Sequence, residues 1–169
     1  MTKQHDVIII GAGVVGNAIA RELSRFNLDV AVLEKELDVA MGTSSRNSGV
    51  IHSGIHYKPG TTRARLNVQG NAMMTDLCRE LKVKIEYIGK LTVAQDDTDV
   101  KELERLKEQG ETNGVPGLEI IDGREMQQRQ PGVGGIKALW SLTTGIICPY
   151  GLTIALAENA VANGVTFYL

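Results

Sequence analysis

The residues nearest the N-terminus that could do chemistry are three glycines, Gly11, Gly13 and Gly16, and the acidic residue Glu34. A glycine at the first position permits a tight turn out of a strand, and the second lets the backbone approach a pyrophosphate. The third lets the following helix pack on the sheet, so that the free N–H groups at its start face the diphosphate. Glu34 lies 18 residues after Gly16, where its carboxylate can accept both hydroxyls of an adenosine ribose. The spacing predicts an adenine-dinucleotide site made by Gly11, Gly13, Val14, Val15, Gly16, Glu34 and Lys35.

A β-α-β unit must position these residues, and the surrounding sequence predicts one. Residues 6–10 form a β-branched run that is typical of a strand buried in a parallel sheet, and residues 30–33 form a second such run. Between them, apolar residues recur at helical spacing from Val14 to Phe26. We therefore expect an α/β fold with a Rossmann-like nucleotide-binding domain. The alternative is a glycine-rich turn in an unrelated α/β protein, and the fold alone does not separate NAD from FAD.

A long segment rich in small polar residues, 40–60, follows Glu34 and has little regular periodicity. Such a segment in a compact domain is usually functional or disordered. Its stretch S-S-R-N-S-G-V-I-H-S-G-I-H-Y-K-P-G (44–60) resembles the D-amino-acid-oxidase-like FAD superfamily, in the branch of glycerol-3-phosphate dehydrogenases and L-2-hydroxyglutarate dehydrogenases. The resemblance continues through G-K-L-T-V-A (89–94), N-G-V-P-G-L (113–118) and T-G-I-I-C-P (144–149).

The resemblance implies an FAD-dependent oxidoreductase that acts on CH–OH donors, in which a hydride passes from a secondary alcohol carbon to flavin N5. It also implies that the polar loop passes beside the pyrophosphate and ribityl chain and approaches the isoalloxazine. Small hydroxyl and amide side chains can donate to phosphate and ring oxygens without blocking the flavin, although an ordinary polar loop is the alternative. The loop residues expected to contact the cofactor are Ser44, Ser45, Arg46, Asn47, Ser48 and Gly49.

Two histidines in the same stretch are the candidate catalytic residues. His52 is the natural proton acceptor, because the pKa of a free imidazole lies near neutrality, although a loop histidine is often structural. His56 is the weaker candidate: the glycerol-3-phosphate branch tends to hold an arginine there, so the histidine resembles the hydroxyglutarate branch. Arg46 resembles the glycerol-phosphate branch instead. The expected substrate is a small anionic hydroxy compound, with glycerol 3-phosphate marginally favoured over L-2-hydroxyglutarate.

The remaining chain predicts a discontinuous arrangement of two domains. By resemblance we expect residues 1–83 and 150–169 to form a truncated FAD-binding domain, and 84–149 to form the first part of an inserted α+β substrate domain. The pattern ends on a strand-like run, 165–169, which suggests a truncated chain. We therefore expect this chain alone to bind FAD or ADP weakly and to be inactive.

Composition narrows the function further. The chain of 169 residues is 43% hydrophobic and 22% charged, with a formal net charge of −2, which argues against a nucleic-acid partner. We see no transmembrane run, no signal peptide and no metal-ligand spacing, and two distant cysteines favour a cytoplasmic setting. Cys148 could serve as a flavin tether, but a buried structural thiol is the favoured interpretation. An NAD-dependent Rossmann dehydrogenase and a nonenzymatic nucleotide-binding module stay as alternatives, and the electron acceptor is left open.

Overall fold

The computed structural model describes residues 3–169, which divide into two compact units. The first unit comprises the chain up to Gly49, Asp76–Lys84 and Ile147–Leu169. The second comprises Val50–Thr75 and Ile85–Ile146. Residues 50–75 thus belong by their contacts to the second unit, whereas the sequence prediction groups them with the FAD-binding domain. The functional assignment of the two parts stays a prediction.

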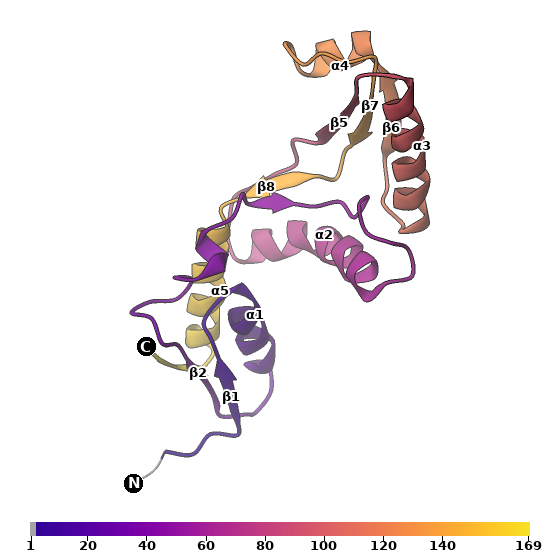
Figure 1. Ribbon diagram of the computed structural model, residues 1–169. Coiled ribbons are helices and arrows are strands. Elements are labelled where there is room, and N and C mark those ends of the chain that lie inside the picture. The colour runs from indigo at the N-terminus through magenta and orange to yellow at the C-terminus, as the bar shows by residue number, and fades with distance from the viewer. Residues whose placement is uncertain (1–2) are drawn as a thin grey trace. The chain divides into compact units, whose positions relative to one another are not determined.

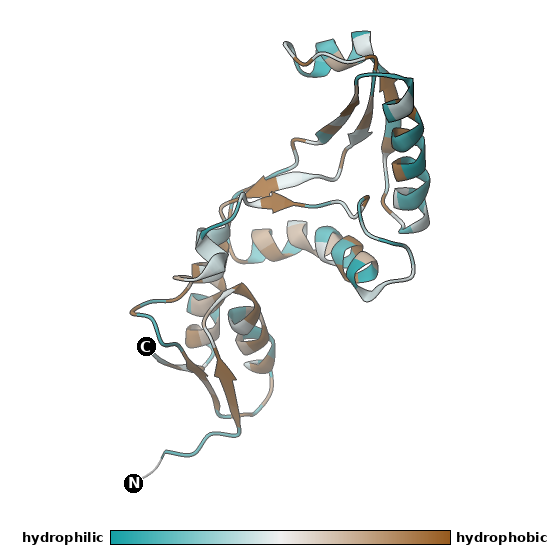
Figure 2. Ribbon diagram, viewed as in Figure 1, coloured by the Kyte–Doolittle hydropathy of each residue, from teal (hydrophilic) through white to brown (hydrophobic). Residues whose placement is uncertain are grey.

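The first unit is a parallel sheet covered by helices. Its strands are β1 (Val7–Ile10), β2 (Val30–Leu33) and β9 (Thr166–Tyr168), in the order β1-β2-β9 with both pairs parallel (Figure 1). The apolar character of β1 and β2 is evident in Figure 2. The helices α1 (Val14–Leu23) and α5 (Pro149–Ala162) pack against each other. Its core is formed by Ala12, Ala20, Val30, Val32, Val39, Ala157, Ala160 and Val165.

The buried face of α1 is narrower than its apolar sequence pattern indicates. Val15 and Ile19 are 69% and 46% exposed, while Asn17, Ala20 and Arg21 are buried. Asn17 Nδ2 donates to the carbonyls of Ala12, at 3.1 Å, and of Thr153 in α5, at 3.2 Å. Small and hydrogen-bonded side chains therefore occupy the close helix contact, where a bulky apolar side chain would hold the helices apart.

The second unit contains two three-stranded sheets. One has the order β3-β8-β4, from β3 (Val50–Ile51), β8 (Gly145–Ile147) and β4 (Ile85–Glu86). The other is antiparallel with the order β5-β7-β6, from β5 (Lys90–Ala94), β7 (Lys137–Ser141) and β6 (Leu118–Asp122). The helix α3 (Asp97–Thr112) packs on this second sheet, and its polar outer surface is visible in Figure 2. The helices α2 (Thr62–Glu80) and α4 (Gly123–Arg129) and the short 3₁₀ helix η1 (Thr43–Ser45) complete the elements.

Local signals place several of these boundaries. Asp122 Oδ1 accepts from the backbone N–H of Glu125 at 2.8 Å, so Asp122 is the N-cap of α4. The strands β4 and β5 follow each other in the chain but belong to different sheets, with Gly89 between them at φ 69°. A Cβ at Gly89 would lie 2.0 Å from the Trp140 ring, so the chain can bend there only because glycine carries no side chain.

Cys148 contradicts the sequence expectation. It is exposed, and its Sγ accepts from the backbone N–H of Gly151 at 3.4 Å as the N-cap of α5. A thiol at this position turns back toward the first turn of its helix and stays at the surface, so the prediction of a buried thiol is wrong. Cys78, in contrast, is buried, and burial raises the pKa of its thiol.

Candidate functional site

The glycine-rich turn has the geometry that its spacing predicts. Gly11 has φ 100°, which lets the chain turn sharply out of β1, and its N–H donates to the carbonyl of Leu33 at 2.7 Å. Gly16 touches the same turn from the first turn of α1. A Cβ there would lie 2.0 Å from the carbonyl oxygen of Gly11. Glycine is therefore required at position 16 for α1 to begin against the strand, as the motif implies.

The start of α1 is capped from the polar loop. Ser44 Oγ accepts the backbone N–H of Val14 at 2.9 Å, and a Cβ at Gly13 would lie 3.1 Å from the same hydroxyl. The first N–H groups of a helix lack intrahelical partners and carry its positive dipole end. Gly13, Val14 and Ser44 thus bring backbone and hydroxyl donors together at one point, which is the arrangement that binds a pyrophosphate.

Glu34 lies at the end of β2 and reaches back to the glycine turn. Its Oε2 accepts from the N–H of Ala12 at 2.8 Å, and its Oε1 accepts from the N–H groups of Lys35, at 2.8 Å, and Glu36, at 3.0 Å. The bond from Ala12, followed by that from Glu36, lowers the pKa of this carboxyl below its ordinary value. Glu34 is therefore held as a carboxylate beside the turn. Lys35, by contrast, extends outward and pairs with Glu36 at 3.5 Å.

The polar loop is organised by its own side chains. Asn47 Nδ2 donates to the carbonyls of Thr43, at 3.1 Å, and Ser44, at 3.2 Å, while its Oδ1 accepts from the N–H of Gly49 at 2.9 Å. Arg46 donates to the carbonyl of Met41, and Ser45 Oγ donates to the carbonyl of Gly42 at 3.2 Å. Ser48 is exposed. Asn47 therefore shapes the loop, and contact of Ser45, Arg46, Asn47, Ser48 and Gly49 with a cofactor stays a prediction.

These residues fit FAD in the chemistry that they present. The helix start offers N–H donors to a pyrophosphate, Gly13 leaves room for the backbone to be approached, and the Glu34 carboxylate can accept the ribose hydroxyls. All of them belong to the first compact unit. The cradle is thus a property of that unit by itself.

His52 and His56 belong to the second unit and line one cavity. The cavity has a volume of about 230 Å³ and is lined by His52, Ser53, Gly54, Ile55, His56, Tyr57, Lys90 and Thr144. We call residues 52–57 the histidine segment, which runs without regular secondary structure after β3. The structure brings the two predicted catalytic histidines together and adds Lys90, which the sequence analysis includes only in the stretch 89–94 and assigns no role.

Side-chain amides from α2 and from the end of α3 hold the histidine segment. Asn71 Nδ2 donates to the carbonyl of His52 at 3.1 Å, and Gln109 Nε2 donates to that of Ile55 at 2.7 Å. Asn113 Nδ2 donates to the carbonyls of Gly54, at 3.0 Å, and Tyr57, at 2.7 Å. We call these three residues the amide clamps. They satisfy backbone acceptors that a loop cannot satisfy by itself, and they therefore fix the histidines in place.

The electrostatic environment of His56 is positive. Lys90 Nζ lies 3.1 Å from His56 Nε2. Partial burial, followed by the charge of Lys90, lowers the pKa of His56 below its ordinary value, with smaller contributions from His52 and Arg105. Glu102 opposes this effect, but it is bonded to Arg105 at 2.6 Å. His56 Nε2 is thus placed to accept a hydrogen bond from the Lys90 ammonium.

Metal-ligand clusters and membrane-spanning helices were sought among the described residues. Within residues 3–169, no group of three or more His, Cys, Asp or Glu side chains could hold a metal ion. No helix in this described part of the chain is long and apolar enough to cross a membrane.

Comparisons with known proteins agree on one family. The family described as FAD dependent oxidoreductase matches residues 6–169. Glycerol 3-phosphate dehydrogenase of Caloramator mitchellensis is 51% identical over 166 residues, which are 97% of this chain and 35% of that protein. The mitochondrial L-2-hydroxyglutarate dehydrogenase of Homo sapiens is 38% identical over 160 residues, which are 94% of this chain and 35% of that protein.

A solved structure supports the same relationship. Dithionite-reduced L-alpha-glycerophosphate oxidase from Mycoplasma pneumoniae, with FAD bound, matches with a TM-score of 0.92 and 30% identity, covering 99% of this chain and 45% of that chain. The predicted α/β fold and the resemblance to FAD-dependent oxidoreductases are both confirmed. The chain spans about a third of the length of the curated relatives it matches.

Proposed function

This chain belongs to the family of FAD dependent oxidoreductases. We propose that it is part of a dehydrogenase that oxidises the CH–OH group of a small anionic substrate. The observation that carries the proposal is the cradle formed by the glycine turn, the Ser44 hydroxyl at the start of α1 and the Glu34 carboxylate. The two dehydrogenases and the oxidase described above carry glycerol 3-phosphate, L-2-hydroxyglutarate and L-alpha-glycerophosphate in their names, and each of these compounds has a CH–OH group.

Glycerol 3-phosphate is the favoured substrate in this proposal. The relative that bears this substrate in its name is 51% identical to this chain over 166 aligned residues, against 38% over 160 residues for the human hydroxyglutarate enzyme. L-2-hydroxyglutarate is the second candidate, because several relatives at 37–43% identity carry that name, and because His56 resembles that branch. Both compounds have a secondary alcohol and an anionic end, so both suit a cavity with histidines and a lysine.

Each residue has a distinct part in the proposed reaction. The N–H of Val14, with Gly13 and Ser44, would hold the pyrophosphate of FAD, and Glu34 would hold its ribose. His52 receives the proton of the substrate hydroxyl on its imidazole, which lines the cavity. The amide of Asn71 holds the backbone of His52 through its carbonyl. FAD, when bound, supplies the acceptor of the two electrons. The division into an FAD-binding part and a substrate part belongs to the same proposal.

The expected cytoplasmic setting is also part of the proposal. It is supported by the unpaired thiols of Cys78 and Cys148, since cysteines in a reducing compartment stay free.

The cofactor is tested first, by titrating the purified chain with FAD and with NAD in a calorimeter. We expect FAD to bind at least ~10-fold more tightly, which corresponds to about 1.4 kcal/mol. The visible spectrum of the bound flavin is the independent readout, because bound NAD does not absorb there. Equal affinities, or tighter binding of NAD, would refute the proposal of a flavoenzyme.

The substrate is tested by anaerobic mixing of the flavin-loaded chain with glycerol 3-phosphate and, separately, with L-2-hydroxyglutarate. Loss of flavin absorbance on a single turnover measures the reaction, and we expect it to be slow in this chain. Faster loss of flavin absorbance with glycerol 3-phosphate supports the favoured substrate. Faster loss with L-2-hydroxyglutarate supports the second candidate instead. A His52→Gln variant that bleaches at an unchanged rate would remove His52 from the mechanism.

A further inference from the structure

We propose that Lys90 and His56 form an anion-binding site in the cavity beside the histidine segment, and that it takes the terminal phosphate or carboxylate of the hydroxy substrate. The nature of the ligand rests on the proposed function, whereas the site itself rests on the contacts described below. Lys90 would then be the residue that selects anionic substrates over neutral alcohols.

The first observation is the contact between the two side chains. Lys90 Nζ lies 3.1 Å from His56 Nε2. An ammonium has no lone pair, so Lys90 donates and Nε2 accepts, which places the imidazole proton on Nδ1. Lys90 keeps further N–H donors for another acceptor. Among residues 3–169 no carboxylate forms an ion pair with Lys90, so its charge is unbalanced by the protein.

The second observation is that two buried hydroxyl residues line the cavity together with Lys90 and His56. Ser53 and Thr144 both line it and are each 4% exposed. Ser141 joins them, because its Oγ donates to Ser53 Oγ at 2.8 Å and accepts from Thr144 Oγ1 at 3.3 Å. A volume of about 230 Å³ accommodates several water-sized groups. The ammonium of Lys90 and the imidazole of His56 beside such a space favour an anionic group there.

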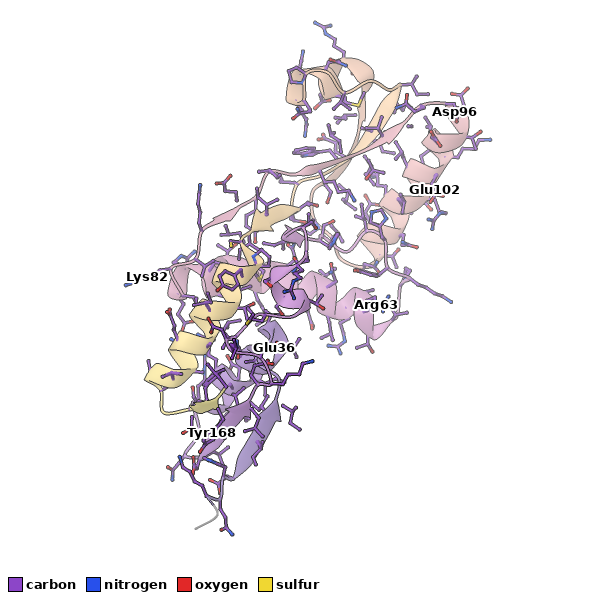
Figure 3. All side chains as sticks on the ribbon, turned by 60° about the vertical axis from the view of Figure 1, so that its left-hand side comes forward. Glu36, Arg63, Lys82, Asp96, Glu102 and Tyr168 are labelled. Atoms are coloured by element: carbon purple, nitrogen blue, oxygen red, sulfur yellow. The ribbon has the colours of Figure 1, made fainter. Side chains whose placement is uncertain are left out.

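The third observation is the balance of charge around His56. From β5 it faces Lys90, and from its own segment it faces His52. From α3 it faces Arg105 and Glu102, of which Glu102 is labelled in Figure 3. Arg105 donates to both oxygens of Glu102, at 2.7 and 2.6 Å, so these two charges largely cancel. The charge that is left over is that of Lys90, and an anion bound there would favour protonation of His56.

This linkage separates a binding site from a structural hydrogen bond. Lys90 and partial burial hold the pKa of His56 below its ordinary value. An anion seated between the Lys90 ammonium and the His56 imidazole offsets the charge of Lys90, so His56 should take up a proton when the anion binds. A lysine that serves only to fix the loop predicts no change in His56 when anions are added.

The test uses the chain with ¹³C- and ¹⁵N-labelled histidine, titrated with inorganic phosphate, glycerol 3-phosphate and L-2-hydroxyglutarate. The three imidazoles give separate nuclear magnetic resonance signals, and a His56→Gln variant identifies that of His56. We expect each saturating anion to move the His56 titration midpoint to higher pH. We also expect Lys90→Gln to weaken anion binding by about tenfold or more, since a charge-assisted contact is lost. Lys90→Arg should restore much of the affinity.

Lys101→Gln is the matched control, because Lys101 is an exposed lysine on α3 outside the cavity lining. It removes the same charge and should leave anion binding unchanged. Anion binding that is equally strong in wild type and Lys90→Gln, or a His56 signal that no anion moves, overturns the inference. If Lys90→Gln no longer folds, Lys90→Arg decides between the two hypotheses. An anion site predicts that the Lys90→Arg variant still binds the anion, because arginine keeps the positive charge. A purely structural contact of Lys90 predicts no anion binding.

Two further measurements identify the chemical group that binds and separate this inference from the proposed function. Tighter binding of glycerol 3-phosphate than of L-2-hydroxyglutarate assigns a phosphate to the site, and the reverse order assigns a carboxylate. FAD titration of the same samples reports on the first unit. Loss of FAD binding with an intact anion response defeats the proposed function alone, whereas FAD binding with no anion response defeats this inference alone.

Discussion

Replacing Gly16 by alanine tests the role of the glycine turn directly. The new Cβ would lie 2.0 Å from the carbonyl oxygen of Gly11, against a limit of 3.0 Å that real Cβ atoms respect. The obstacle is backbone and cannot rotate away, so α1 or the turn must shift by at least about 1 Å. Overpacking of this kind costs about 3 kcal/mol. Alanine regains about 1 kcal/mol of helix propensity, which leaves a net destabilisation of about 2 kcal/mol.

The assay is thermal unfolding followed by circular dichroism, with and without FAD. A net loss of about 2 kcal/mol lowers the Tm by roughly 4–8 °C in a chain of this size. The same shift displaces the N–H of Val14, so FAD affinity should fall as well. Gly70→Ala is the matched control, since Gly70 also lies within a helix, α2, and a Cβ there meets nothing within 4 Å. It should raise the Tm by roughly 1–4 °C through helix propensity alone.

The pair of variants gives a clear decision. A Gly16→Ala chain that unfolds at the wild-type temperature, or that gains as much as Gly70→Ala, would refute the close contact between α1 and the turn. A Gly16→Ala chain that is destabilised but binds FAD normally would separate the fold from the cradle, and would show that the glycine serves packing only.

Three further predictions concern the hydrogen bonds of the two sites. Glu34→Gln should weaken FAD binding about tenfold in calorimetric titration, because an amide accepts the ribose hydroxyls less strongly than a carboxylate does; unchanged affinity would remove Glu34 from the site. The folded-state pKa of Glu34 is lowered, chiefly by the N–H of Ala12, so its contribution to stability is complete above pH ~5 and is lost as the pH falls through that lowered value; urea unfolding at several pH values should show a smaller acid loss in Glu34→Gln. Asn113→Ala removes two donors from the carbonyls of the histidine segment and should cost about 1–3 kcal/mol in urea unfolding. Asn163→Ala, at the corresponding end of α5 with one exposed bond, should cost less than about 1 kcal/mol, and equal losses would contradict the role of Asn113 as a clamp.

The glycine turn and Glu34 of the first unit could be predicted from the sequence, because the residues that form them lie close together in the chain. Gly11, Gly16 and Glu34 act within a span of 24 residues, and each has a stereochemical requirement that few residue types meet. In the second unit, the cap of α4 is local in the same way, because Asp122 and its partner Glu125 are three residues apart. Where a residue and its partner are neighbours in the chain, spacing alone predicts the contact.

The second unit shows what spacing does not reveal. The amide clamps lie 19 to 59 residues from the carbonyls they bind, and a carbonyl has no identity in the sequence. Nothing in the spacing of Lys90 indicates His56 as its partner, and only the fold places the two side chains 3.1 Å apart. Cys148 was misplaced for a related reason, since the tendency of cysteine to be buried is an average that a capping position overrides.

The bond between Ser44 Oγ and the N–H of Val14 has a consequence for how a phosphate arrives. The hydroxyl already occupies the first donor of α1, so ligand entry there is an exchange of one acceptor for another. When a phosphate oxygen accepts from the N–H of Val14, the bond from that N–H to Ser44 Oγ is lost. The released Ser44 hydroxyl can then donate to the phosphate. The Ser44 hydroxyl thus accepts the bond that an anion would accept, and it keeps the N-terminus of α1 ordered. The heat of FAD binding should accordingly be smaller than a count of the final contacts would give, and larger once Ser44 is replaced by glycine.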